Sequence, residues 1–182
     1  VLYRGWENKL KISASGYEPE AIKISCSGCS ISKKGDFYIA KPGKGKIATV
    51  SVSATTEDGK TVKLAAEEFR IFPLPLPKPY FANQTFDKPT MKKGTAISAS
   101  QVLAKLGDSP LNVKYTVTGF KMIVTKGGKI AELKAKNGKL TKDMKAAIKK
   151  LPKGTSLTFV GVSAAGPSGK SQPIGGLSFK LI

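Results

Sequence analysis

The sequence predicts two domains of different fold class: an immunoglobulin-like β-sandwich of residues 1–71, and an α+β domain of residues 82–182 that combines an antiparallel sheet with two short helices. Three observations support this division. Strand-like alternation fills the first part, helical periodicity appears only in the second, and the proline-rich residues 72–81 lie between them. With 182 residues, of which 40% are hydrophobic, the chain is long enough to form two small cores.

Residues 1–71 contain short segments in which apolar and polar residues alternate, as they do in half-buried strands. The segments with this pattern span residues 10–14, 22–25, 37–40, 47–54 and 61–72. Asp58-Gly59 lies between the last two segments and predicts a hairpin turn. Six or seven strands in about 70 residues, without a helical stretch, are typical of a small sandwich that serves as a spacer or a binding module.

Residues 72–81 read Phe-Pro-Leu-Pro-Leu-Pro-Lys-Pro-Tyr-Phe. Each proline removes a backbone donor, fixes φ at about −65° and pushes the preceding residue toward extended geometry. We therefore expect this decapeptide to be a semi-rigid linker between the two domains.

The second domain is expected to contain two helices. The first spans residues 97–107, with Ser98 as N-cap and Gln101 as its capping-box partner. The second begins at Thr141 as N-cap and ends at about Leu151. The expected strands of this domain span residues 113–125, 130–135, 157–164 and 177–181.

Most of the net charge of +19 lies in the second domain. Residues 1–71 carry twelve Lys or Arg against eight Asp or Glu, whereas residues 82–182 carry eighteen Lys against four acids. The chain has 29 Lys and two Arg. Because Arg grips phosphate and guanine with two bonds and Lys offers only a point charge, no nucleic-acid partner is expected. A partner surface rich in acids is favoured instead.

The second predicted helix has Met144, Ile148 and Leu151 on one face and lysines on the other. A lysine face is either a solvated surface or a dock for an acidic partner, and the charge of the whole domain favours docking. The candidate docking residues are Lys142, Lys145, Lys149, Lys150, Lys153 and Lys170.

Cys26 and Cys29 form the only cysteine pair, in the order Cys-Ser-Gly-Cys. Such a pair is a structural disulfide or two buried thiols at a hairpin, a redox site, or part of a shared zinc site. A redox site would place the first Cys at a helix N-terminus, but turn and strand residues follow here. A zinc site would need further ligands, and the chain has no His and no other Cys. The structural role is favoured.

Residues 164–171, Ala-Ala-Gly-Pro-Ser-Gly-Lys-Ser, are one residue short of a Walker A loop, and Gln-Pro-Ile-Gly-Gly follows where a helix is needed. A hairpin turn is the better interpretation. The absence of His removes the commonest general base, and no pair of carboxylates or Ser-Lys dyad stands out. We therefore expect no enzyme activity and no cofactor.

Sequence blocks in one order along the whole chain resemble the C-terminal part of the GldM/PorM family of the Bacteroidetes type IX secretion and gliding motility machinery. The blocks are Val1-Leu-Tyr-Arg-Gly5 with Glu7-Asn8, Tyr38-Ile-Ala-Lys-Pro-Gly43, the proline-rich segment to Phe81, Lys149-Lys-Leu-Pro-Lys-Gly154, Ala164-Ala-Gly-Pro and Leu177-Ser-Phe-Lys-Leu-Ile182. The resemblance implies a homodimeric periplasmic shaft, anchored in the inner membrane by an upstream helix. Its distal end would meet GldK/PorK and GldN/PorN at the outer membrane.

The leading hypothesis is thus a non-enzymatic module that transmits force and docks through its basic C-terminal domain on an envelope complex. The alternative is a binder of anionic polymer, either polysaccharide or nucleic acid, at the cell envelope. The scarcity of Arg and the lack of a motif that combines aromatic and basic residues disfavour this alternative.

Overall fold

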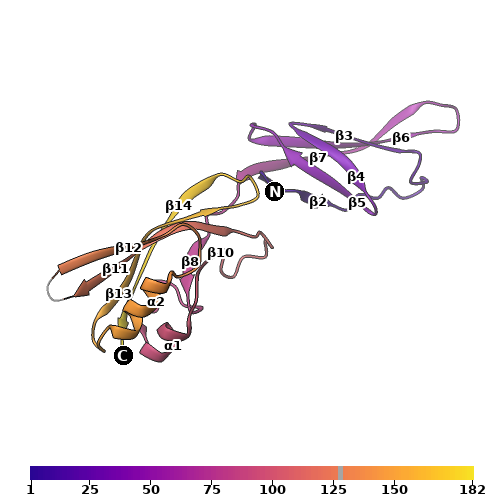
Figure 1. Ribbon diagram of the computed structural model, residues 1–182. Coiled ribbons are helices and arrows are strands. Elements are labelled where there is room, and N and C mark those ends of the chain that lie inside the picture. Colours follow the sequence, from indigo (N-terminus) through magenta and orange to yellow (C-terminus); the bar gives the residue numbers. More distant parts are fainter. Residues whose placement is uncertain (127–128) are drawn as a thin grey trace. The chain divides into compact units, whose positions relative to one another are not determined.

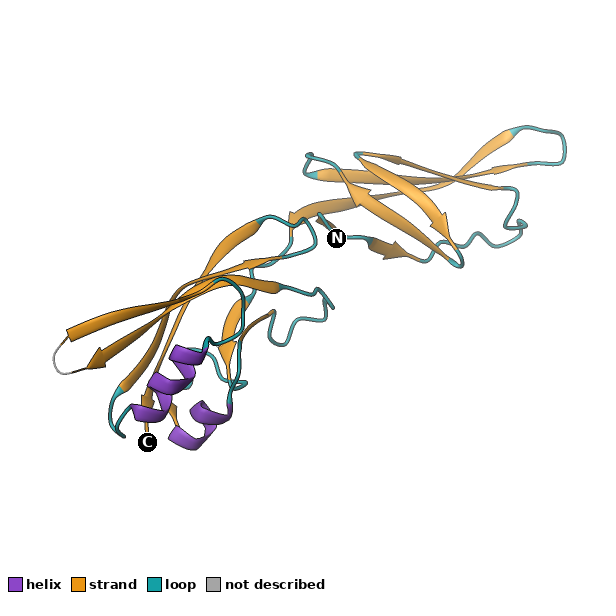
Figure 2. Cartoon of the chain, viewed as in Figure 1, coloured by secondary structure: helices purple, strands orange, loops and turns teal. Residues whose placement is uncertain are grey.

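The computed structural model describes residues 1–126 and 129–182, which divide into two compact units, Val1–Leu74 and Pro75–Ile182 (Figure 1). Strands dominate both units, and the helices lie in the second (Figure 2). The predicted order of an immunoglobulin-like domain followed by an α+β domain is confirmed.

Unit 1 consists of two sheets. Its strands are β1 (Leu2–Arg4), β2 (Asn8–Leu10), β3 (Ile22–Ser27), β4 (Cys29–Lys34), β5 (Phe37–Pro42), β6 (Ile47–Thr55) and β7 (Thr61–Pro73). One sheet has the order β1-β7-β6-β3 and the other β2-β5-β4. β1 runs parallel to β7, whereas the other pairs are antiparallel.

The core of unit 1 is small and contains one buried polar side chain that joins its strands. Leu2, Ala40, Ala48 and Ile71 form its central apolar cluster. Beside them, the Asn8 amide donates to the carbonyl oxygens of Tyr3, Trp6 and Ala40 at 2.9, 3.0 and 3.1 Å, and its Oδ1 accepts from the Tyr3 N–H at 2.7 Å. Because each polar atom of Asn8 is paired, its burial costs little free energy and fixes the path of the chain from β1 to β2.

Unit 2 contains a sheet with the order β12-β11-β13-β14-β9, a ribbon of β8 and β10, and the helices α1 and α2. The elements are β8 (Lys78–Phe81), β9 (Thr90–Met91), α1 (Lys93–Ser98), β10 (Val102–Lys105), β11 (Thr116–Lys126), β12 (Lys129–Ala135), α2 (Lys142–Lys150), β13 (Ser156–Ala165) and β14 (Ser171–Leu181). β9 pairs in parallel with β14, and the other pairs are antiparallel.

One face of this sheet forms the core of unit 2. Met122 and Phe159 from the sheet lie fully buried together with Met144 and Ile148 of α2 and Phe81 of β8. The Phe81 and Phe159 rings are 4.7 Å apart between centroids. The helices and the β8–β10 ribbon therefore cover this inner face, and the opposite face, called the outer face below, carries side chains that are half-buried or exposed.

The second predicted helix is confirmed. α2 begins after Thr141, whose Oγ1 accepts from the Met144 N–H at 3.2 Å, and Met144, Ile148 and Leu151 are buried as expected. The strands predicted at 130–135 and 157–164 correspond to β12 and β13. The strands predicted at 113–125 and 177–181 begin at Thr116 and Ser171 instead.

The helix predicted at residues 97–107 is wrong. Helix α1 ends at Ser98, whose hydroxyl donates to the Gly94 carbonyl at 3.0 Å instead of capping a new helix. Residues 102–105 form β10 because Val102 and Ala104 point into the core while the strand pairs with β8.

Residues 72–81, expected as a linker, are largely in strands. Phe72 and Pro73 end β7, residues 78–81 form β8, and only residues 74–77 lie outside a strand. In unit 1, the strand expected at 10–14 is also shorter, since β2 ends at Leu10 and irregular chain follows to β3.

Candidate docking surface

Helix α2 presents four of the six candidate lysines on its exposed side. Its buried side is held in the core by Met144 and Ile148. At 100° per residue, Lys142, Lys149 and Lys150 occupy the arc opposite these two residues, Lys145 lies at its border about 60° from Ile148, and all four lysines are exposed. This group, called the α2 lysine face, consists of Lys142, Lys145, Lys149 and Lys150.

Asp143 is the acidic residue of the first turn of α2, and Lys149 and Lys150 lie in the last turn. This order complements the helix dipole and favours the folded helix. The lysines are thus anchored on a rigid, capped element, which is the arrangement that a docking surface needs.

The other two candidate lysines have different positions. Lys153 follows α2 in an exposed turn, close in sequence to the α2 lysine face. Lys170 lies in the turn between β13 and β14, at the opposite end of β13 from Lys153. Because a strand of ten residues spans about 33 Å, Lys170 does not join the other five. The turn at 166–170 joins two paired strands, so the hairpin expected in place of a Walker A loop is confirmed.

A second basic site, which the sequence did not indicate, lies on the outer face of the sheet. It is a shallow hollow of about 570 Å³ bordered by three lysines and three hydroxyl side chains. This hollow, called the outer basin, is lined by Lys121, Lys134, Lys136, Thr118, Ser163 and Ser171, together with Gly119 and Gly161.

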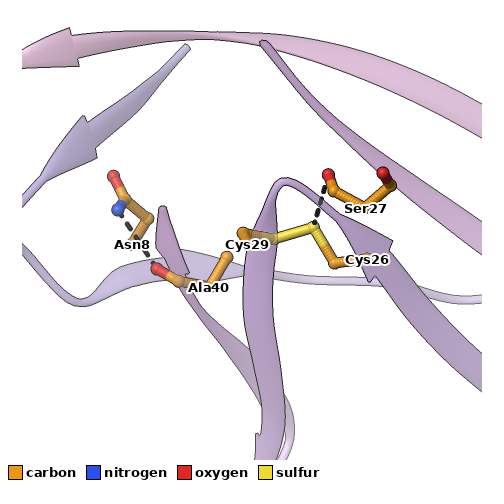
Figure 3. The surroundings of a disulfide bond; sticks show 5 residues. All are labelled: Asn8, Cys26, Ser27, Cys29 and Ala40. Carbon is orange, nitrogen blue, oxygen red and sulfur yellow. Dashed lines mark hydrogen bonds between the residues drawn. A yellow bond between two sulfur atoms is a disulfide. The ribbon is translucent and has the colours of Figure 1, made fainter. Parts of the chain in front are cut away.

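Cys26 and Cys29 form a disulfide, with their Cα atoms 5.5 Å apart (Figure 3). They do not lie in a hairpin, because β3 and β4 belong to different sheets: Cys26 pairs with Val50 of β6, and Cys29 with Pro42 of β5. The disulfide therefore closes the short crossover between the two sheets of unit 1.

Gly28, inside this crossover, has φ of +80°, and a Cβ at this position would lie 2.6 Å from the Ile47 carbonyl oxygen. Its own carbonyl accepts from the Gly43 N–H at 3.0 Å. Only glycine fits this backbone conformation and this close approach to β6 without strain.

The ionisable groups of the described residues do not form a catalytic set. The Lys41 ammonium donates to the Glu7 carboxylate at 2.9 Å. This hydrogen bond and the attraction of the Lys41 charge lower the pKa of the exposed Glu7 carboxyl. Burial raises the pKa of Tyr115, whose hydroxyl donates to the Pro75 carbonyl at 2.8 Å. Within residues 1–126 and 129–182, no group of three or more His, Cys, Asp or Glu is placed to hold a metal ion.

No helix in the described part of the chain is long and apolar enough to cross a membrane.

A search of curated proteins finds no match. Two family models match, the GldM third domain over residues 1–71 and the GldM C-terminal domain over residues 73–181. Together they cover nearly the whole chain, and their boundary falls close to the division between units 1 and 2. GldM domains belong to a structural component of type IX secretion and gliding motility, and not to a known enzyme family. This chain therefore belongs to the GldM family, of which it contains the third and C-terminal domains.

Proposed function

We propose that this chain is a non-enzymatic, force-transmitting periplasmic part of the secretion or gliding machine, and that it docks through the α2 lysine face on an acidic surface of the envelope complex. The α2 lysine face carries this proposal. It combines four exposed ammonium groups with an apolar side that is fixed in the core of unit 2. The expected partners are proteins of the GldK/PorK and GldN/PorN type, and the chain is expected to act as a homodimer anchored by an upstream inner-membrane segment.

Charge attraction predicts the size of the effect. Exposed ion pairs contribute about 0.5 kcal/mol each, so loss of four pairs weakens binding by about 2 kcal/mol, or roughly thirtyfold. Because exposed charges are screened by salt, the affinity of the unmodified chain should also fall as ionic strength rises.

The experiment measures binding of the chain to a purified GldK/GldN-type complex from the same organism. The test variant replaces the four lysines of the α2 lysine face with Gln. The matched control replaces four exposed lysines of unit 1, which are Lys11, Lys23, Lys33 and Lys63. We expect the test variant to lose affinity and the control to keep it. Equal loss in both variants would mean that binding follows net charge alone and would contradict docking through α2.

The homodimer is tested separately by sedimentation of the chain over a range of concentrations. A monomer at every concentration would contradict dimerisation through these two domains and would leave the docking experiment unaffected.

A further inference from the structure

We propose that the outer basin, together with the free edge of β12, binds an extended acidic segment of a partner protein. The segment would add to the sheet as a strand beside β12 and place a carboxylate next to Lys134 and Lys136, at the β12 margin of the basin. This inference rests on the proposed function only in that the partner is an acidic protein, and it concerns the face of the sheet opposite α2.

The outer basin exists because the sheet is irregular there. The pairing of β11 with β13 shifts register on both sides of Gly119, and the pairing of β13 with β14 shifts between Phe159 and Ser163. Gly161 has φ of +60° and no side chain to fill the space. Bulges of this kind bend strands and redirect side chains, and they are enriched beside functional sites.

Two of the three basin lysines carry a positive charge that no described residue neutralises in an ion pair. Lys121 and Lys134 are direct register partners on β11 and β12. Like charges directly opposite each other destabilise a sheet. Glu132 pairs with Lys121 at 3.0 Å, whereas Lys134 and Lys136 form no ion pair with any other residue that the structure describes. A bound anion would relieve this repulsion.

The hydroxyl groups of the basin lie on β11, β13 and β14, two or more strand spacings of about 4.8 Å from a strand added beside β12, so they line its far side and do not contact that strand's carboxylate. Thr118 and Ser171 hydrogen-bond to each other at 2.6 Å, and Ser163 lies beside them in the lining. The long side chains of the basin lysines attract carboxylate oxygens without requiring the planar two-bond geometry of Arg. No acidic side chain lines the basin. Its chemistry therefore fits a carboxylate.

The edge of the sheet indicates what carries this carboxylate. Among the described residues, β12 pairs with β11 on one side and with no strand on the other. The unpaired backbone groups of an edge strand are a template for an added strand, and such addition is a common mode of peptide recognition. Exposed Ile130 and Lys134 lie along this edge, so the strand offers both an apolar and a cationic contact.

The probe is a synthetic peptide, acetyl-Thr-Glu-Thr-Glu-Thr-Glu-Thr-amide, in which every Glu projects to the same side of a strand. Binding to the whole chain is followed by NMR, with the Gln-for-Glu peptide as control. The basin variant is K121Q/K134Q/K136Q, and the matched variant with the same change in charge is K11Q/K23Q/K33Q in unit 1.

We expect the basin variant to bind the peptide about tenfold more weakly, and the unit 1 variant to bind it within about twofold of the unmodified chain. Two further peptides carry backbone N-methyl groups, one at its Thr residues and the other at its Glu residues. The peptide whose methylated amides face β12 should lose binding, and the other peptide should keep it. The K134Q chain should unfold at the same temperature as the unmodified chain or at a higher one, because the substitution removes the repulsion between Lys121 and Lys134. This result would separate a loss of binding from a loss of folding.

Four results would overturn the proposal. They are equal loss in the unit 1 variant, equal binding by both N-methylated peptides, tighter binding of an oligogalacturonate than of the peptide, and no binding of the peptide at about 1 mM. Since the α2 lysine face is tested with the purified partner complex and its own variants, failure of either proposal is recognised independently of the other.

Discussion

The disulfide between Cys26 and Cys29 should stabilise unit 1 by a modest amount that its short loop determines. Only three positions separate the two cysteines in sequence. Loop-closure entropy gives about 1.9 kcal/mol at 25 °C for a closed loop of four residues, against about 3 kcal/mol for fifteen. This contribution is still measurable, because it is a large part of the stability of unit 1. The core of this unit contains small residues such as Ala40, Ala48 and Ala54, so burial of apolar area contributes little free energy of its own.

Trp6, the single Trp of the chain, lies in unit 1, so its fluorescence reports the unfolding of this unit alone. Urea titrations with and without a phosphine reductant should differ by about 1.9 kcal/mol, which lowers the midpoint by about 1–2 M. The C26S/C29S variant should match the reduced protein and should not respond to the reductant. A loss above about 4 kcal/mol, or below about 0.5 kcal/mol, would refute the argument from loop entropy.

Substitutions of Gly28, Thr141 and Tyr115 test individual contacts. Gly28→Ala should lower the free energy of unfolding of unit 1 by about 2–4 kcal/mol. Gly59→Ala is the control, because Gly59 has a similar φ of +77° but open space around it, and it should lower this free energy by only about 1 kcal/mol. Trp6 fluorescence during urea unfolding measures both effects. Thr141→Ala should lower the stability of unit 2 by about 1 kcal/mol through loss of the α2 cap, and Thr141→Ser should restore it, as read from circular dichroism; equal loss in both would contradict capping. Tyr115→Phe should cost about 1 kcal/mol at neutral pH. Because burial raises the pKa of Tyr115 in the folded state, this difference should narrow as the pH rises above about 10, where the unfolded chain loses the proton first; a constant difference would contradict the shift.

Local patterns predicted the elements whose stability is local. α2 has a cap, an apolar stripe and a lysine face within eleven residues, and the structure contains each of them. The period of two in β13 is likewise visible in the sequence, because its inward residues are apolar throughout.

The errors arose where distant residues decide the structure. The short apolar run at 102–104 fits a helix or a strand, and only pairing with β8 makes it a strand. The proline-rich segment has an extended backbone, as expected, but nothing in it indicates that residues 78–81 find a partner in β10. The two cysteines suggest a turn, yet no local signal shows that their strands belong to different sheets.

The outer basin was missed for the same reason. Lys121 and Lys134 are thirteen positions apart in sequence and become neighbours only through the register of β11 and β12. The hydroxyls come from β11, β13 and the start of β14. No spacing in the sequence links these residues, and the glycines that leave the hollow open resemble ordinary turn residues.

The strong basic charge of the C-terminal domain has a structural consequence for both proposals. The α2 lysine face lies on a helix that covers the inner face of the sheet, whereas the outer basin lies on the outer face. Exposed charges farther apart than the Debye length of about 8 Å act independently at physiological salt. A partner bound at one surface therefore does not neutralise the other. For this reason each experiment compares its test variant with a control variant that carries the same change in charge elsewhere on the chain, which separates an effect of the surface from an effect of net charge.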